Sequence, residues 1–231
     1  ISGVHNVAIG VNSLSSTTTG GLNVAIGYNS LGSFQPSVNN TGSNTCVGFQ
    51  SGSGTTTGLD NTFIGANTGT TSSITGSNLT CLGHDAEPSS ASATNEVTLG
   101  DSNVATLRCG ATTITQVSDS RDKTNAIDSP YGLDFINSLR PVQFTWQRRV
   151  LVPGDENHTK NGTTRLGFLA QELLSAMPNN ENDVLDLVYE SNPDRLEAKY
   201  GNLIPILAQA IKDLKAQNDA LAARVTALEN A

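Results

Sequence analysis

The first half of the chain is built from a short repeat that ends in glycine. Four copies read Asn-x-x-aliphatic-Gly, and two looser copies are one residue longer. The asparagines are 17, 21, 17, 17 and 17 residues apart. A strand of four or five residues cannot bury its face alone, so neighbouring copies must stack on one another. A low-complexity linker would not keep an aliphatic residue before the glycine of every copy. The copies are residues 6–10, 23–27, 44–48, 61–65, 78–83 and 95–100.

Each copy has the pattern of a strand followed by a turn. The residue before the glycine is always Ile, Val or Leu, whereas the preceding side chain varies, as expected when neighbours on a strand face opposite sides. The glycine allows a turn with positive φ. Cys46 and Cys81 share a repeat position that holds Ala or Phe in the other clear copies. We therefore expect small buried thiols there, rather than a disulfide framework or a metal site.

Composition changes abruptly between Val117 and Ser118. Residues 1–117 contain one Lys/Arg and five Asp/Glu, and residues 118–231 contain the other 12 and 16. This change predicts two domains, 1–117 and 118–231. The net charge of −8 divides evenly between them, which argues against a nucleic-acid partner. No apolar stretch approaches the roughly 20 residues that span a bilayer, so no membrane insertion is expected. No cofactor or metal is expected either.

The second half predicts an α+β domain. A helix over 130–139 ends at Pro141, and another over 170–177 ends at Pro178. Alternation over 142–146 predicts a strand that pairs with 165–168 across a polar loop, 153–162. Branched residues over 104–117 predict that β structure continues from the repeats toward the domain boundary.

The C-terminus has heptad periodicity over about residues 203–229. Two interleaved series, each with a spacing of seven, occupy positions a and d. Ile at a with Leu at d favours a parallel dimer, and Asn218 at an a position sets the register. A helix that packs only on its own domain is the alternative reading. The series are Ile204, Ile211, Asn218 and Val225, and Leu207, Leu214, Leu221 and Leu228.

A serine and a lysine at the composition boundary are candidate catalytic residues. Ser118 can act as a nucleophile if a neutral lysine, Lys123, takes its proton. Lysine ordinarily has a pKa of about 10.4. Burial at a chain–chain interface, or a nearby cation such as Arg121, must therefore favour the neutral form of Lys123. On a continuous helix, residues five apart are rotated by about 500° about the axis, so the two side chains would lie on different faces. The segment must therefore turn, or the lysine must come from a neighbouring chain. Ser120 is a weaker candidate nucleophile, and a solvated turn is the alternative on spacing alone.

The glycine repeats resemble known fibre sequences. Over about residues 3–101 they are similar to the head repeats of trimeric autotransporter adhesins and to the shafts of phage tail fibres. The resemblance implies a trimeric β-helix or β-roll stalk and says little about its ligand.

The second half resembles a different family over about residues 104–231. Ser118-Asp-x-Arg-x-Lys123, the segments 132–142 and 167–172, and the terminal heptads follow one another as in the C-terminal intramolecular chaperone domain of endosialidase tailspikes, phage neck appendages and related viral fibres. The resemblance implies that the domain trimerises, assists folding of the preceding stalk and then releases itself. It assigns catalysis to Ser118 and Lys123 and the cleaved bond to Val117–Ser118.

Together these features predict the C-terminal part of a viral tail fibre or tailspike. The expected fold is a mainly β repeat stalk followed by an α+β domain that ends in a long coiled-coil helix. The expected partners are two further copies of the chain, a trimer that comes from the resemblance and not from the heptads, and a host-surface glycan or receptor for the stalk. The expected location is the virion, after assembly in the host cytoplasm. The alternative is a structural trimeric adhesin or fibre fragment that binds a host-surface receptor and does not cut itself.

Overall fold

A computed structural model describes residues 3–39, 41–110, 114–147 and 161–231 of the chain. The described residues form two compact units, one up to Leu107 and one from Arg108 onward. The domain boundary that composition predicts between Val117 and Ser118 stays a prediction.

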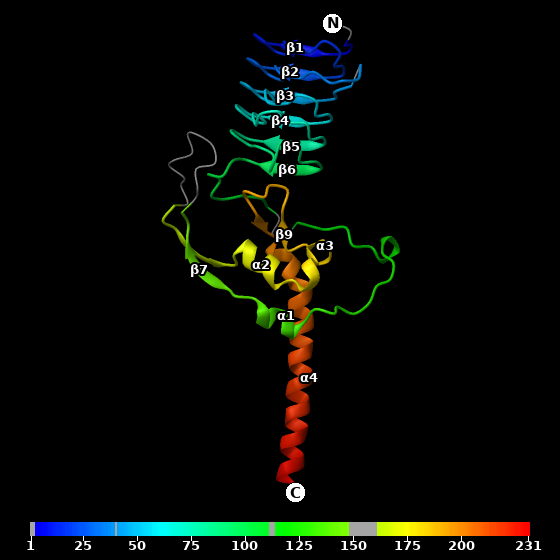
Figure 1. The fold of residues 1–231 in the computed structure, drawn as a ribbon, viewed down its shortest axis with the longest axis vertical. Coiled ribbons are helices and arrows are strands. Elements are labelled where there is room, and N and C mark those ends of the chain that lie inside the picture. The colour runs from blue at the N-terminus through cyan, green and yellow to red at the C-terminus, as the bar shows by residue number, and fades with distance from the viewer. Residues whose placement is uncertain (1–2, 40, 111–113, 148–160) are drawn as a thin grey trace. The chain divides into compact units, whose positions relative to one another are not determined.

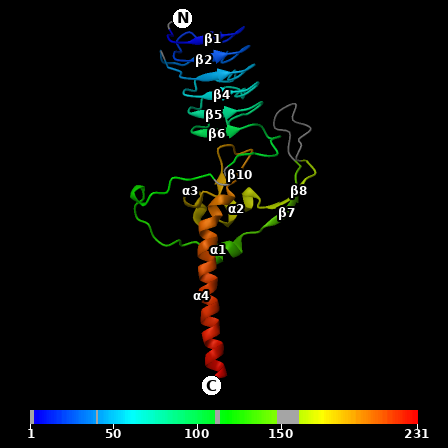
Figure 2. The same cartoon turned by 180° about the vertical axis from the view of Figure 1, so that it is seen from behind.

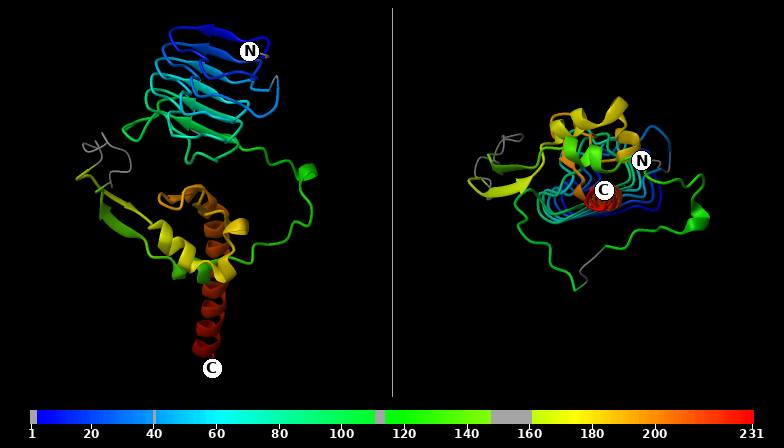
Figure 3. Two further views of the ribbon diagram at one scale, coloured as in Figure 1. Left: turned by 45° about the horizontal axis from the view of Figure 1, so that its top comes forward. Right: turned by 90° about the horizontal axis from the view of Figure 1, so that it is seen from below.

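The first unit is a β-solenoid of about five turns, which confirms the repeat stalk. Its strands form a single parallel sheet in the order β1 to β6, one rung above another (Figure 1). Equivalent repeat positions pair in register, so that Ala25 lies between Ala8 and Cys46. The coils overlie one another when viewed from below (Figure 3). The strands are β1 (Val7–Ile9), β2 (Val24–Ile26), β3 (Thr45–Val47), β4 (Thr62–Ile64), β5 (Leu79–Leu82) and β6 (Glu96–Leu99).

The repeat glycines are required both by backbone conformation and by space. Gly27 has a φ of 131° and Gly48 a φ of 138°, values that residues with a side chain rarely adopt. A Cβ atom on Gly27 would lie 2.2 Å from the carbonyl oxygen of Gly48 in the next coil. Glycine therefore lets the coils approach to the spacing of hydrogen-bonded strands at this corner.

The variable strand position points into the solenoid. Ala25, Cys46, Phe63 and Cys81 are buried there, as the sequence predicts for the two cysteines. Burial raises the pKa of Cys81 to about 12 and raises that of Cys46 further, because a thiolate loses its hydration inside the core. Both side chains therefore act as apolar core groups.

The repeat asparagines form a ladder inside the solenoid. The Asn44 backbone N–H donates to the Oδ1 of Asn23 at 3.0 Å, and the Asn61 N–H donates to the Oδ1 of Asn44 at 3.0 Å. The side chains of Asn23, Asn44 and Asn61 are fully buried. Each asparagine Oδ1 thus accepts a hydrogen bond from a backbone N–H of the next coil. This N–H would otherwise have no partner at the corner.

The ladder position shifts by one residue in the two looser copies. Thr62 pairs with Thr80, so Leu79 is equivalent to Asn61, and it donates its backbone N–H to Asn61 Oδ1 at 2.9 Å. Leu79 pairs in turn with Glu96. The alignment of Asn78 and Asn95 with the earlier asparagines was therefore wrong, because both copies contain one additional residue before the glycine.

The invariant aliphatic residues face outward. Ile9 is 58% exposed, Ile64 43% and Leu99 48%, although each belongs to the most regular position of the repeat. These residues alternate with the buried column along their strands and form a stripe on the outer face of the sheet. We call Ile9, Ile26, Val47, Ile64, Leu82 and Leu99 the aliphatic stripe.

The second unit is an α+β domain that ends in a long helix, as predicted (Figures 1 and 2). Helix α1, strand β7 and helix α2 fall within the ranges predicted for them, and β8 begins and ends one residue before the predicted 165–168 but pairs with β7 as expected. The polar loop predicted for 153–162 lies mostly outside the described residues. The helices are α1 (Leu133–Ser138), α2 (Ala170–Ala176), α3 (Asn182–Leu185) and α4 (Leu203–Glu229), and the short helical turns are η1 (Ser120–Asp122), η2 (Pro178–Asn180) and η3 (Tyr200–Asn202). The strands are β7 (Val142–Thr145), β8 (Thr164–Gly167), β9 (Val188–Tyr189) and β10 (Glu197–Ala198).

The β structure predicted over 104–117 is absent from the described residues of that range. Ile114 and Val117 are 95% and 87% exposed, and no strand pairs with the segment. Branched side chains favour a strand only when a neighbouring strand receives their backbone and packs against them. The prediction failed because it used propensity without a pairing partner.

Helix α4 has two apolar faces. Leu203, Ile206 and Ala210 are buried within the core of the second unit. The heptad residues lie on another face, and Ile204 and Ile211 are each 68% exposed. The helix therefore packs on its own domain without using the heptad seam. No helix in the described part of the chain has the length and apolarity that a membrane crossing requires.

Candidate functional site

Ser118 and Lys123 lie on an exposed loop that contains the single helical turn η1 (Figure 1). Asp119 precedes the turn with φ −67° and ψ 134°, and Lys123 follows it with φ −125° and ψ 139°. Both flanking residues are thus extended, and only three residues between them are helical. The chain reverses over this turn, and therefore residues 118 and 123 face each other.

The structure brings the two candidate residues together within one chain. Lys123 Nζ donates a hydrogen bond of 2.5 Å to Ser118 Oγ. On a continuous helix the two side chains would point to different faces. They meet here because only residues 120–122 are helical and the segment turns. Geometrically, the same chain supplies both groups. A lysine in contact with a serine hydroxyl can accept its proton once the amine is neutral.

Asp119 and Arg121 form a second pair on the same turn. Asp119 Oδ1 accepts from the Arg121 backbone N–H at 2.9 Å, and the two carboxylate oxygens accept from Arg121 Nε and Nη2. These bonds lower the pKa of Asp119 and raise that of Arg121. The charge that was expected to act on Lys123 is therefore engaged by a carboxylate.

In a single chain, water reaches both Ser118 and Lys123. Both side chains are exposed, as is Val117, whose peptide bond to Ser118 is the bond that the sequence predicts to be cleaved. Water stabilises the charged form of an amine and competes for a developing oxyanion. Ser118 and Lys123 are in contact in this geometry, but their surroundings do not exclude solvent.

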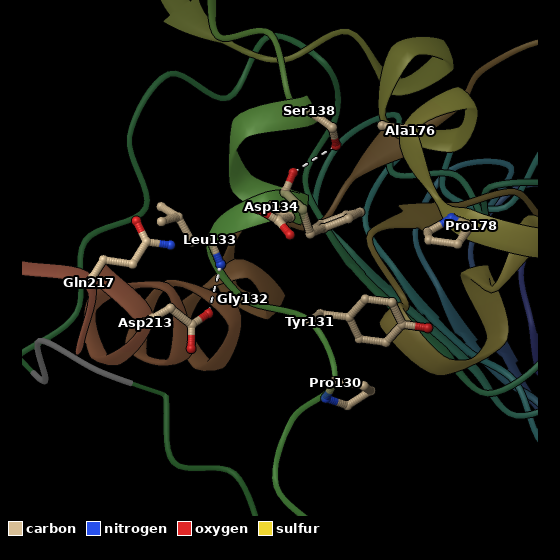
Figure 4. Close-up of a pocket in the computed structure, with 11 residues that line it drawn as sticks. Pro130, Tyr131, Gly132, Leu133, Asp134, Ser138, Ala176, Pro178, Asp213 and Gln217 are labelled. Atoms are coloured by element: carbon tan, nitrogen blue, oxygen red, sulfur yellow. Dashed lines mark hydrogen bonds between the residues drawn. The ribbon is translucent and has the colours of Figure 1, made fainter. Parts of the chain in front are cut away.

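A separate cavity of about 510 Å³ lies between the start of α1 and helix α4 (Figure 4). Asp213 Oδ2 accepts the Leu133 backbone N–H at 3.0 Å and so caps the first turn of α1. A Cβ on Gly132 would lie 2.0 Å from that oxygen, so any larger residue here would displace the Asp213 carboxylate from its capping position. Neither Ser118 nor Lys123 lines the cavity. In the part of the chain that the structure describes, no cluster of His, Cys, Asp or Glu is arranged to hold a metal ion.

Sequence reasoning missed two aspartates that cap helical turns: Asp119 accepts the Arg121 N–H, and Asp213 accepts the Leu133 N–H. An Asp two residues before an Arg is a local signal for a capped turn, and it was available in the sequence. The pairing of Asp213 with Leu133 spans 80 residues and has no local signal.

Residues 118–180 match the family model described as chaperone of endosialidase, Peptidase_S74. This match supports the identification of the C-terminal region as a chaperone domain. The matched segment begins at Ser118 and includes η1, α1, the β7–β8 hairpin and α2. Comparisons with curated proteins and with solved structures found no match. The match is consistent with the C-terminal chaperone domain of a tailspike or fibre, and such a domain fits a virion location.

Proposed function

We propose that the chaperone domain folds and trimerises the β-solenoid and then releases itself by cleaving the Val117–Ser118 bond. The observation that carries the proposal is the 2.5 Å contact from Lys123 Nζ to Ser118 Oγ, at the first residue of the family match. The proposal includes the virion as location, assembly in the host cytoplasm, and a host-surface glycan or receptor as the ligand of the stalk.

The reaction begins with proton transfer from Ser118 Oγ to the neutral amine of Lys123. The alkoxide attacks the carbonyl carbon of Val117, and the bond between this carbon and the Ser118 nitrogen breaks. The nitrogen takes up a proton and becomes the amino terminus of the released domain. The Val117 acyl group is then an ester on Ser118 Oγ, and water hydrolyses it to the Val117 carboxylate and the free hydroxyl.

Assembly supplies the dry environment that the reaction needs. Ile114 and Val117 are almost fully exposed in one chain, and a neighbouring copy that covers them would also exclude water from Lys123. Loss of water favours the neutral amine and strengthens hydrogen bonds to an oxyanion. Cleavage should therefore follow assembly of the stalk rather than precede it.

Two uncovered apolar surfaces support association with further copies of the chain, and the number of three comes from the family resemblance. The aliphatic stripe of the solenoid and the heptad face of α4 each repeat regularly along their element. Both are largely exposed in one chain, although Ile26 and Val47 of the stripe are half-buried. Regular exposed apolar rows of this kind are typical of surfaces that pair with other copies.

The first prediction concerns the bond that is cut. The wild-type chain should yield fragments 1–117 and 118–231, because Ser118 can attack only with its base in place. Ser118→Ala and Lys123→Ala should each remain intact, and Ser120→Ala should still be processed. Intact-mass spectrometry after prolonged incubation in neutral buffer distinguishes these outcomes. Normal processing of Ser118→Ala would refute the assignment, and an intact wild-type trimer would favour the non-cleaving fibre.

A further inference from the structure

The turn between Ser118 and Lys123 has few restraints of its own. Its backbone bonds, from Asp122 N–H to Asp119 O and from Lys123 N–H to Ser120 O, are 3.2 and 3.3 Å long. A single turn of this kind is marginal without further interactions. The surrounding segment does not provide them, since residues 114–118 and 120–128 are exposed.

The Asp119–Arg121 pair provides the missing restraint. One carboxylate oxygen caps the turn by accepting the Arg121 N–H at 2.9 Å. The same carboxylate receives Nε at 3.0 and 3.1 Å and Nη2 at 2.6 Å, so the guanidinium is held by its fork. Asp119 follows Ser118 directly, and Arg121 is two residues from Lys123. The pair therefore fixes the angle at which the chain enters and leaves the turn.

We propose that Asp119 and Arg121 are positioning residues for self-cleavage, which hold the turn that keeps Lys123 Nζ on Ser118 Oγ. The inference rests on the proposed function. It differs from the expectation that Arg121 promotes a neutral lysine by its charge, because in this geometry the guanidinium charge is paired with Asp119. A misplacement of about 1 Å in a reacting group can slow a reaction on the order of 100-fold.

The pair persists over the pH range of the reaction. Arg121 lowers the pKa of Asp119, so the contribution of the pair is present above the carboxylate's unfolded pKa and is lost as the pH falls through its folded pKa. The pair is therefore intact at neutral pH, where the reaction is proposed to run. The other charged groups on this segment are Asp122, Lys123 and Asp128.

Matched alanine substitutions separate positioning from charge. Asp119→Ala and Asp122→Ala each remove one negative charge near Lys123, but only Asp119 contacts Arg121. Positioning predicts that Asp119→Ala slows cleavage about tenfold and that Asp122→Ala stays within about twofold of wild type. A charge effect predicts that both variants cut faster, because each loses a carboxylate that stabilises the ammonium. Cleavage rates come from pulse–chase in a cell-free translation reaction of the full chain.

Arg121→Lys provides the second comparison. It keeps the charge but loses the fork, so positioning predicts slow cleavage with an unchanged midpoint in the pH–rate profile. A wild-type rate in Arg121→Lys, or a shifted midpoint in Asp119→Ala, would overturn the inference.

A measurement on uncleaved protein separates this inference from the proposed function. In Ser118→Ala, the hydrogen-bonded Arg121 Nε–H should exchange with water more slowly than it does after the additional Asp119→Ala substitution. NMR with ¹⁵N-arginine labelling reads this signal whether or not the wild-type chain cuts. Equal exchange in the two proteins would overturn the positioning role, whereas an uncut wild type with a protected Arg121 would overturn only the self-cleavage.

Discussion

Asn44 connects three neighbouring coils of the solenoid through one buried side chain. Its Oδ1 accepts the Asn61 N–H at 3.0 Å, and its Nδ2 donates to Gly58 O at 3.0 Å and to Asn23 Oδ1 at 3.3 Å. The residue is fully buried, so water cannot replace any of these partners. Removal of the amide leaves a backbone donor and a backbone acceptor without partners in the core.

The second prediction follows from these buried groups. Asn44→Ala should destabilise the solenoid by about 3 kcal/mol, the sum for two unsatisfied buried groups. The matched control is Asn39→Ala, the same change at an exposed residue, and it should stay within about 0.5 kcal/mol. Denaturant unfolding of both in the uncleaved Ser118→Ala chain measures the difference. Equal midpoints would mean that the ladder contributes no stability.

Single residues differ in how far their sequence context determines them. The burial of Cys46 and Cys81 was predictable, because both share a position with Ala25 and Phe63. The register of the asparagine ladder was not predictable. The looser copies also begin with an asparagine, and only the strand pairing shows that Leu79, rather than Asn78, is equivalent to Asn61. The contact between Ser118 and Lys123 was predicted as a pair, but the capped turn that permits it in one chain was not.

Helix α4 packs on its own domain with one face and leaves its heptad face exposed. Its buried face includes Leu203 and Ile206, and Asp213 reaches from it to cap α1. Its heptad face includes Ile211 and Leu214, which are 68% and 47% exposed. Substitutions on the second face should therefore change assembly and leave the fold of the domain intact.

The third prediction tests the heptad face. Ile211→Asp should prevent trimer formation, since an unpaired carboxylate buried in the seam costs at least about 2 kcal/mol per chain. Ala216→Asp, at an outward heptad position of the same helix, should assemble normally. In the Ser118→Ala background, sedimentation equilibrium should give about three times the chain mass of 24.1 kDa for the control and less for Ile211→Asp. A dimeric control would mean that the Ile/Leu seam sets the stoichiometry.

Elements with strong periodicity were predictable, and elements that depend on distant partners were not. Helix α4 covers Leu203–Glu229, which matches the predicted 203–229, because its heptads repeat without interruption. Strand β7 followed from alternation over 142–146, and its pairing with β8 followed from the polar loop between the two runs. The failure over 104–117 has the opposite cause, since a strand exists only if another strand pairs with it.

At the scale of the molecule, each unit leaves an apolar surface that its own chain does not cover. The solenoid exposes the aliphatic stripe, and the chaperone domain exposes the heptad face of α4. In the proposed trimer, separate chains must meet in register before any contact forms, and this carries an entropic cost. A coiled coil that holds the chains together raises their effective concentration and so reduces that cost. Removal of the chaperone domain after assembly takes this advantage away.

The last prediction concerns refolding. Stalk released from the full-length chain should be soluble and heat-resistant, whereas residues 1–117 expressed alone should aggregate or stay unfolded, because nothing aligns their aliphatic stripes. After thermal unfolding, the uncleaved Ser118→Ala protein should recover its oligomer and the cleaved stalk should not, since its persistence depends on slow unfolding rather than on equilibrium. Recovery is measured by circular dichroism and size-exclusion chromatography at equal chain concentration. Equal recovery of the two proteins would eliminate the chaperone function, because the attached domain would then make no difference to the step it is proposed to assist.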